Sequence, residues 1–420
     1  MAQCAGKSRR LQRRTPDLKP PLSAAPPLHP REARFYELDI LRGVAAILVV
    51  TFHYKHFLLI SDTAGFDYDH LPFGALLLPV YIYGQFFVEL FFSISGYVFF
   101  WLYGEAVSSH RTDAKSFFIA RFARLYPLYF VTLIFVAVGQ PLFRHLYGGD
   151  FIYSANSTGN FVLNLFAVQQ WVINAPQSFN GPAWSISVEL FLYVLFFVVC
   201  YFRKNEVVLL TALCVGGMVF KNAHLMDPND FARGLPNFFL GGLVYYAVRN
   251  LREPANAVWR RRLTWLLAVL VPCLWVISYI SGRNEPLDRP AANLMEFIFN
   301  TELFLYVVLP LSLLALGLMQ DHWKVKFMSR THLHRASWIG DISYSIYLLH
   351  FPLQLAVMLV LSHWSFAWRV PVFASPLAFM MFMGVAIGLA WLSHRYFEMP
   401  MQRFLRGWMT RRLVKPATAS

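Results

Sequence analysis

The stretch "LRGVAAILVVTFHY", residues 41–54, sets the fold class of the chain. Arg42 and His53 stand near its two ends, and the ten residues between them carry no charge. An α-helix needs about 20 mostly apolar residues to cross the roughly 30 Å hydrocarbon core of a membrane. Arg42 and His53 are eleven residues apart, which is three helical turns plus about 20°, so they share one face about 16 Å apart along the axis. The stretch predicts a membrane-spanning helix with an arginine near its cytoplasmic end and a histidine near mid-membrane.

The rest of the chain has the same apolar character. Of its 420 residues, 57% are hydrophobic and only 14% are charged, which lies outside the range of ordinary soluble domains. Apolar runs that could cross a membrane lie at 39–60, 79–103, 117–138, 185–202, 206–221, 234–249, 263–281, 301–319, 338–361 and 374–397. The run at 161–173 is too short and too rich in amide side chains to cross, so we expect it to be re-entrant or interfacial. The sequence predicts an all-α polytopic membrane protein with about ten transmembrane helices in one domain, residues 39–398.

The positive charge follows the predicted topology. If the N-terminus is cytoplasmic, the cytoplasmic side holds 30 of the Lys and Arg residues. The external side holds the other 7, namely Lys55, Arg144, Lys221, Arg233, Arg283, Arg289 and Arg369. This asymmetry indicates an even number of spans with both termini in the cytoplasm. It also argues against nucleic acid as a partner, which would need a basic face on a soluble surface.

The two ends of the chain differ from the apolar region in composition. Residues 1–38 are rich in Pro and Arg, which predicts a disordered tail; a transit peptide is the alternative, although its prolines break an amphipathic helix. Residues 399–420 form a basic tail that could bind anionic lipid. The four cysteines show no paired or metal-ligand spacing, so neither disulfides nor a metal site is predicted. Nothing in the sequence sets the oligomeric state.

Glu89, in the second predicted span, is the candidate partner of His53. Entering from outside, that span places Glu89 about ten residues deep, which is close to the level of His53. We expect the carboxylate to orient the imidazole, so that His53 can act as a general base. The alternatives are a neutral Glu89 in an apolar site, a His53 that only hydrogen-bonds a neighbouring helix, and an Arg42 that snorkels to the interface.

Two further spans carry polar groups at helical spacing. Ser185 and Glu189 are four residues apart, and Ser343, Tyr347 and His350 follow one another at intervals of four and three, so each set shares a helix face. Helix packing would explain the serines and the tyrosine equally well. A histidine near mid-membrane is harder to explain by packing.

A pair of arginines opens the third span. Arg121 and Arg124 are three residues apart at its cytoplasmic end. They could simply obey the positive-inside rule. Alternatively they bind a polyphosphate together with Arg42, a task for which the rigid guanidinium fork is well suited.

Taken together, these motifs resemble acyltransferase family 3, a family of integral-membrane acyltransferases. The likeness runs from about Tyr36 to Pro400. It rests on "YELDILRGVAAILVVTFHY", in which arginine and histidine are separated by ten residues, and on "VELFFSISGYVF", "RFARLYP", "WSISVELFLY", "DISYSIYLLHFP" and "YFEMP". Each block is weak alone, and their order along the chain makes the resemblance specific.

The resemblance implies transfer of an acyl group, most often acetyl, from cytoplasmic acyl-coenzyme A to a hydroxyl of a carbohydrate. The acceptor would belong to an exported polysaccharide or a lipid-linked glycan, and the enzyme to a bacterial inner membrane. Acetyl-CoA would be the donor substrate, and no permanently bound cofactor is implied. Arg42 and His53 match the essential pair of the family. Arg121 and Arg124 match its donor-side arginines, whereas Glu189 and His350 match motif positions without a settled role.

The acceptor is expected to approach from the external side, past Trp184, Glu189 and the long segment 139–183. His53 would either deprotonate the acceptor directly or carry the acyl group as a transient acyl-imidazole, and the sequence leaves both routes open. The sequon at Asn156 is interpreted as a chance match.

A proton-coupled secondary transporter of a sugar or organic anion is the competing function, because buried His, Glu and Arg also build proton relays. The two halves of the chain show neither an internal repeat nor a matched pair of broken helices, which disfavours it. A membrane scaffold without enzymatic activity is disfavoured by the buried charges.

Overall fold

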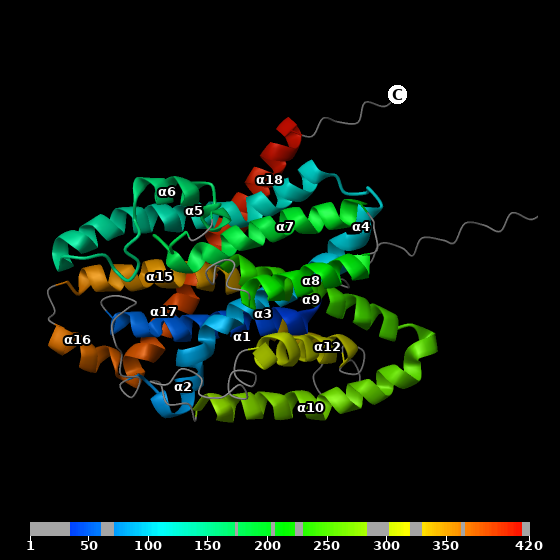
Figure 1. Ribbon diagram of the computed structural model, residues 1–420. Helices are drawn as coiled ribbons and strands as arrows, with labels where there is room; N and C mark the ends of the chain where they lie inside the picture. The colour runs from blue at the N-terminus through cyan, green and yellow to red at the C-terminus, as the bar shows by residue number, and fades with distance from the viewer. Residues whose placement is uncertain are drawn as a thin grey trace, which may run out of the picture. The chain divides into compact units, whose positions relative to one another are not determined.

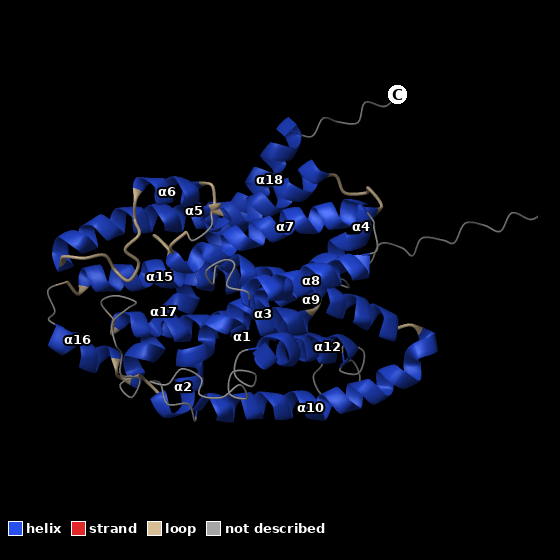
Figure 2. Cartoon of the chain, in the orientation of Figure 1, coloured by secondary structure: helices blue, strands red, loops and turns tan. Residues whose placement is uncertain are grey.

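The structure is a computed structural model that describes residues 34–59, 71–172, 175–202, 206–222, 230–283, 302–319, 330–362 and 366–413. Helices account for all the regular elements in these ranges, and no strand occurs among them (Figure 2). The all-α fold class predicted from the sequence is confirmed. Most of the predicted N-terminal tail lies outside the described residues, and the first helix, α1, begins at Tyr36.

The longer helices are α1 (Tyr36–His53), α2 (Gly74–Tyr83), α3 (Phe87–Phe99), α5 (Ala114–Tyr147), α7 (Trp184–Phe202), α8 (Glu206–Asn222), α9 (Asp230–Leu251), α10 (Ala257–Arg283), α12 (Leu309–Met319), α15 (Ser343–Val360), α17 (Pro376–Ser393) and α18 (Met399–Leu413). Shorter pieces are α4 (Glu105–Ser108), α6 (Thr158–Leu165), α13 (Arg330–Ala336), α14 (Trp338–Asp341) and α16 (Phe366–Phe373). The predicted C-terminal tail thus begins as the helix α18.

Within the ranges that the structure describes, six helical stretches are long and apolar enough to cross a membrane. They are Gly74–Ser108, Ala114–Tyr147, Gly181–Phe202, Pro254–Ile280, Ser343–Val360 and Pro376–Arg412, with Val207–Lys221 and Phe304–Met319 as shorter apolar helices. Helix α1 is not among them, because a candidate span may hold at most two charged residues in 18 and α1 holds three, Glu37, Asp39 and Arg42. The chain is therefore a polytopic membrane protein, and the count of ten spans remains a prediction.

Helix α1 packs against α3, α14 and α15, while α3 packs on α9 and α15 on α5 (Figure 1). Close backbone approach holds α3 to α9. A Cβ atom added at Gly96 would lie 1.8 Å from the carbonyl oxygen of Phe238, and one added at Gly241 would lie 2.0 Å from that of Ser93. Only glycine fits at such a contact, as is common between membrane helices.

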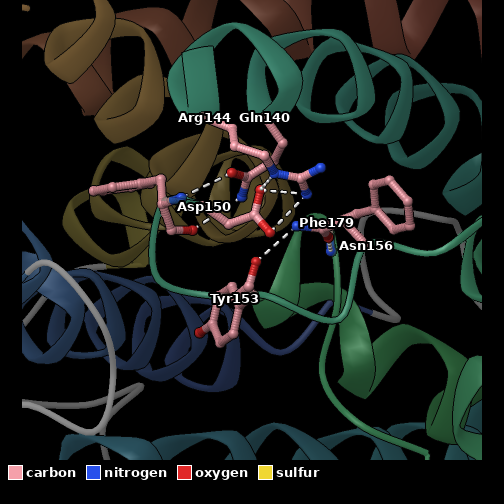
Figure 3. A network of polar contacts seen from close by, with 7 residues as sticks. Gln140, Arg144, Asp150, Tyr153, Asn156 and Phe179 are labelled. Carbon is pink, nitrogen blue, oxygen red and sulfur yellow. Dashed lines mark hydrogen bonds and ion pairs between the residues drawn. The ribbon is translucent and has the colours of Figure 1, made fainter. Parts of the chain in front are cut away.

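The segment between α5 and α7 folds back onto the bundle. Gln140 on α5 donates to the carbonyl of Phe151 and accepts from its N–H, both at 2.9 Å, and Arg144 pairs with Asp150 at 2.7 Å (Figure 3). Asn156 donates to the carbonyl of Tyr153 at 2.7 Å and accepts from the N–H of Phe179 at 2.6 Å (Figure 3).

This network fixes residues 150–156 against α5. It also engages the side-chain nitrogen and oxygen of Asn156. The predicted short piece at 161–173 includes the second part of α6 (Thr158–Leu165) and the 3₁₀ turn Gln169–Trp171, and neither is long enough to cross a membrane.

Candidate functional site

A narrow cavity of about 50 Å³ lies where α1, α3, α7 and α15 meet. Its polar lining consists of Arg42, Ser95, Ser185, Glu189, Ser343, Tyr344 and Tyr347, together with four apolar residues, Val88, Phe91, Phe92 and Ile186. The polar lining comes from sequence blocks far apart in the chain. The structure therefore brings together five of the predicted site residues, from the first, fourth and ninth predicted spans.

The carboxylate of Glu189 is the hub of this cavity. It accepts hydrogen bonds from the hydroxyls of Tyr193 and of Ser95, the latter at 3.3 Å. Arg42 is half-buried and lies within electrostatic range of Glu189, Tyr193 and Arg124. No hydrogen bond from the Arg42 guanidinium is found among the described residues, so its donors are available for an anion.

Tyr347 joins α15 to the beginning of α7. Its hydroxyl donates to the carbonyl of Pro182 and accepts from the hydroxyl of Ser185 at 2.8 Å. Helix α7 thus begins inside the bundle at the cavity, so Ser185 and Glu189 line it from one helix face, as their spacing predicts.

The two arginines of α5 differ in their surroundings. Arg124 is exposed and lies within electrostatic range of Arg42. The guanidinium of Arg121 donates to the hydroxyl of Tyr103 at 2.7 Å and stacks against the rings of Phe99 and Tyr103. Of the three arginines predicted to bind a polyphosphate, Arg42 and Arg124 therefore lie near each other. Arg121 instead contacts aromatic rings on α3 and on the π-helical turn that follows α3.

His53 ends α1 with its ring in one tautomer. Its Nδ1 lies 2.9 Å from the carbonyl oxygen of Val49. Since a carbonyl oxygen can only accept, Nδ1 carries the hydrogen and Nε2 carries the lone pair. The sequence predicts that a carboxylate orients this imidazole, and the structure assigns that task to the backbone of its own helix. Nε2 is the nitrogen that can act as a base or nucleophile.

The predicted pair of His53 with Glu89 is wrong. Glu89 is fully buried and accepts a 2.6 Å ion-paired hydrogen bond from Arg233 on α9. The guanidinium of Arg233 also lies 4.9 Å from the ring centroid of Trp184. The buried carboxylate thus finds a full positive charge, which stabilises it better than a neutral imidazole would. Trp184 is itself buried inside the bundle, so it does not line an open path for an acceptor.

Two polar residues near His53 were missed by the sequence reasoning. The side-chain N–H of Gln354 donates to the carbonyl of His53 at 2.7 Å. The side-chain oxygen of Gln354 therefore faces His56, whose Nδ1 lies 3.2 Å away. All three side chains are buried. Gln354 follows His350 by four residues, so it continues the face begun by Ser343 and Tyr347, and that spacing is the signal that could have found it.

His350 completes a cluster of three buried histidines. Its ring centroid lies 4.9 Å from that of His53, and the rings of His53 and His56 lie 5.0 Å apart. Neither ring nitrogen of His350 has a hydrogen-bond partner among the described residues. Across the same residues, no group of three or more His, Cys, Asp or Glu side chains could hold a metal ion. His350 thus places a second buried imidazole beside that of His53.

The motif "YFEMP" also packs against α15. Glu398 accepts hydrogen bonds from Ser345 and, at 3.3 Å, from Ser393. This contact ties the π-helical turn His394–Glu398 to the helix that carries Tyr347 and His350.

Comparisons with known proteins agree with this picture. A family model described as an acyltransferase domain matches residues 35–395. Acyltransferase MdmB of Streptomyces mycarofaciens is 28% identical over 169 residues, which are 40% of this chain and 39% of that protein. Protein 2 in the picA locus of Rhizobium radiobacter is 32% identical over 182 residues, which are 40% of this chain and 81% of that protein.

The match to MdmB thus covers about two fifths of its length. No solved structure gives a significant match. The family match covers nearly the whole described bundle, including every block that carries the cavity and the histidine cluster. The chain belongs to the family of integral-membrane acyltransferases that these motifs indicate, enzymes that transfer acyl groups.

Proposed function

We propose that the protein transfers an acyl group, most often acetyl, from cytoplasmic acyl-coenzyme A to a hydroxyl of a carbohydrate. The acceptor would be an exported polysaccharide or a lipid-linked glycan, and the bacterial inner membrane would be the site of action. The observation that carries the proposal is the placement of Arg42 and His53. Both lie on α1, one lining the polar cavity and the other presenting Nε2 as its unprotonated nitrogen.

The donor would bind with its phosphates at the cytoplasmic mouth. Arg42 supplies a guanidinium with available donors, and the nearby Arg124 adds a second positive charge. His53 lies eleven residues further along α1, about 16 Å at 1.5 Å per residue. The pantetheine arm of coenzyme A has about this reach, so the thioester would arrive beside the histidine.

The chemistry would proceed at Nε2 of His53. In direct transfer, Nε2 takes the hydroxyl proton while the acceptor oxygen bonds to the thioester carbon. The C–S bond then breaks, and the proton passes to the departing thiolate. In the covalent route, Nε2 itself attacks the thioester carbon, and the C–S bond breaks to release the coenzyme A thiolate. The acceptor oxygen later attacks the acyl carbon, the C–N bond to His53 breaks, and the hydroxyl proton passes to the thiolate. The fixed tautomer serves both routes.

The acceptor would reach the histidines from the predicted external side. There the segment after α5 reaches the cluster, with the rings of Phe151 and Tyr153 centred 6.4 and 6.1 Å from that of His56. Trp171 in the same segment is 44% exposed. Aromatic faces of this kind suit binding of a sugar.

The test uses the purified full-length chain in lipid nanodiscs with labelled acetyl-CoA and a crude glycan extract. Wild type should transfer label, while His53→Ala should slow transfer by about 10²–10⁴-fold, the range for losing a general base. Arg42→Ala should raise KM for acetyl-CoA. The matched controls are His145→Ala and Arg403→Ala at exposed positions, which should behave as wild type. A His53→Ala variant with wild-type transfer would rule out the proposed role of the histidine.

A further inference from the structure

The ring of His350 is the one imidazole in the cluster whose hydrogen-bonding capacity is unused. Its side chain is 0% exposed, and both ring nitrogens are without a partner among the described residues. A neutral imidazole offers one N–H donor and one acceptor. Burying both without partners costs free energy, so such a group in a folded protein calls for an explanation.

The ring N–H groups of the two neighbouring histidines already have hydrogen-bond acceptors. The N–H of His53 is held by the carbonyl of Val49, and that of His56 by the oxygen of Gln354. Gln354 is in turn fixed by its own bond to the carbonyl of His53. Of the three ring N–H groups in the cluster, only that of His350 makes no hydrogen bond of normal distance and angle among the described residues, although the backbone of Ile346 and Tyr347, one turn earlier on α15, lies close to its ring.

The place of His350 connects the two halves of the site. It lies one turn after Tyr347, which lines the cavity with Arg42, and its ring centroid is 4.9 Å from that of His53. A thioester delivered from the cavity toward Nε2 of His53 would therefore pass beside this ring. The polar atom that the thioester brings there is its carbonyl oxygen.

We propose that His350 is a catalytic residue whose ring N–H binds the carbonyl oxygen of the thioester and stabilises the oxyanion formed during transfer. The inference rests on the proposed function, because it requires a thioester donor. It divides the work between the two histidines: His53 provides the lone pair, and His350 provides the hydrogen.

The step balances without a further reactant. As the acceptor oxygen, or Nε2 of His53, bonds to the carbonyl carbon, the C=O electron pair moves onto oxygen, where the N–H of His350 holds it. When the pair returns, the C–S bond breaks. In direct transfer the thiolate then takes the proton that Nε2 of His53 collected from the acceptor. In the covalent route it leaves as the thiolate and takes the acceptor's hydroxyl proton when the acyl-imidazole is cleaved. His350 donates a hydrogen bond throughout and gives up no proton. Such a donor acts where charge develops, which is how oxyanion holes accelerate acyl transfer.

The kinetic test measures thiol release from acetyl-CoA by the full chain in nanodiscs. His350→Phe removes the donor and should lower kcat by about 10²-fold, the usual effect of losing one oxyanion donor, with KM for acetyl-CoA within about twofold. Asn carries its amide nitrogen near the position of Nδ1, and Gln near that of Nε2. One of His350→Asn and His350→Gln should therefore recover part of the rate, and the pH midpoint set by His53 should stay in place. His145→Phe is the matched exposed control.

A second readout reports the hydrogen bond itself. In a His53→Ala background, which holds the thioester intact, the carbonyl stretch of bound ¹³C-acetyl-CoA should shift to lower frequency, and adding His350→Phe should abolish the shift. Full activity of His350→Phe, a loss carried by KM alone, or rates for both Asn and Gln no better than Phe would overturn the inference while the proposed function stands. A folded wild type that neither binds nor consumes acetyl-CoA would overturn both.

Discussion

Helices α10 and α15 are both long and apolar enough to cross a membrane, yet they meet different surroundings. In the apolar stretch of α10 only 11% of residues are buried, against 61% in α15. The more hydropathic helix is the exposed one, with a mean hydropathy of 2.2 against 1.4. The value for α15 is lowered by a stripe of Ser343, Tyr347, His350 and Gln354, all buried. Hydropathy identifies helices that can cross, and the polar stripe on the less hydropathic one identifies the site.

The largest expected effect concerns a buried charge. Arg233→Leu leaves Glu89, whose side chain is 1% exposed, without its ion-pair partner. We expect a loss of about 3–5 kcal/mol in unfolding free energy, the range for breaking a buried pair. The matched variant on the exposed helix is Arg261→Leu near the start of α10, for which a change within about 0.5 kcal/mol is expected. Denaturant unfolding of both in the same detergent compares them, and equal losses would refute the distinction between the buried pair of α3 and α9 and the exposed surface of α10.

Next comes the stripe itself. Gln354→Leu keeps the apolar bulk but leaves the carbonyl of His53 and the N–H of His56 without partners. Each unsatisfied buried group costs about 1–3 kcal/mol. Trp265→Leu on α10, where the side chain is 65% exposed, should change stability little. Thermal unfolding measures both, and a Gln354→Leu variant as stable as wild type would show that the two hydrogen bonds of Gln354 have no structural role.

Two glycines give a smaller contrast of the same kind. Gly96→Ala must push α3 away from the backbone of α9, and overpacking of this kind costs about 1–3 kcal/mol. At Gly388, on an exposed part of α17, an added Cβ meets nothing within 4 Å. Gly388→Ala should therefore stabilise by about 0.4–1 kcal/mol, through lower entropy of the unfolded chain. Opposite signs in the two melting-temperature shifts are the expected result, and shifts of the same sign contradict the packing.

The smallest effect lies outside the membrane. Asp113 caps α5 by accepting from the N–H of Ser116 at 3.2 Å. Hydrogen bonds from the side chain and then from the backbone of Ser116 lower the pKa of its carboxyl. A carboxyl whose pKa is lowered by folding stabilises the fold above its unfolded pKa, and that stabilisation is lost as pH falls through the folded value. Asp113→Ala should cost about 1 kcal/mol near neutral pH. In wild type and variant melted at a series of pH values, the difference should shrink toward acid, and a constant difference would contradict the cap.

Much of the site could be predicted from the sequence, because helical periodicity is local. Ser185 with Glu189, and Ser343 with Tyr347, line one cavity as their spacings indicate. The partner of Glu89 could not be predicted, because Arg233 is 144 residues away and α9 meets α3 only through tertiary packing. The depth of Trp184 was missed for a related reason. Predictions from span boundaries assume that a helix begins at the membrane surface, whereas α7 begins inside the bundle.

The histidine cluster shows the same limit. The sequence places His53 and His350 near mid-membrane but cannot show that a backbone carbonyl, rather than a carboxylate, fixes the tautomer of His53. That outcome depends on the ring conformation at the end of α1, where Nδ1 turns back onto Val49. Gln354 was not predicted as a site residue, because a single glutamine in an apolar run carries no signal by itself. Its spacing from Ser343, Tyr347 and His350 on the same helix face is what indicates its position.

The central claim is that the end of α1 and the stripe of α15 form one reaction centre. The most direct test is a double-mutant cycle on His53→Ala and His350→Phe, with acyl transfer from acetyl-CoA as the readout. Residues that act as a unit give non-additive losses. We predict that the double variant is about as slow as His53→Ala alone. Losses that multiply would show that the two histidines act independently, and the single centre would have to be abandoned.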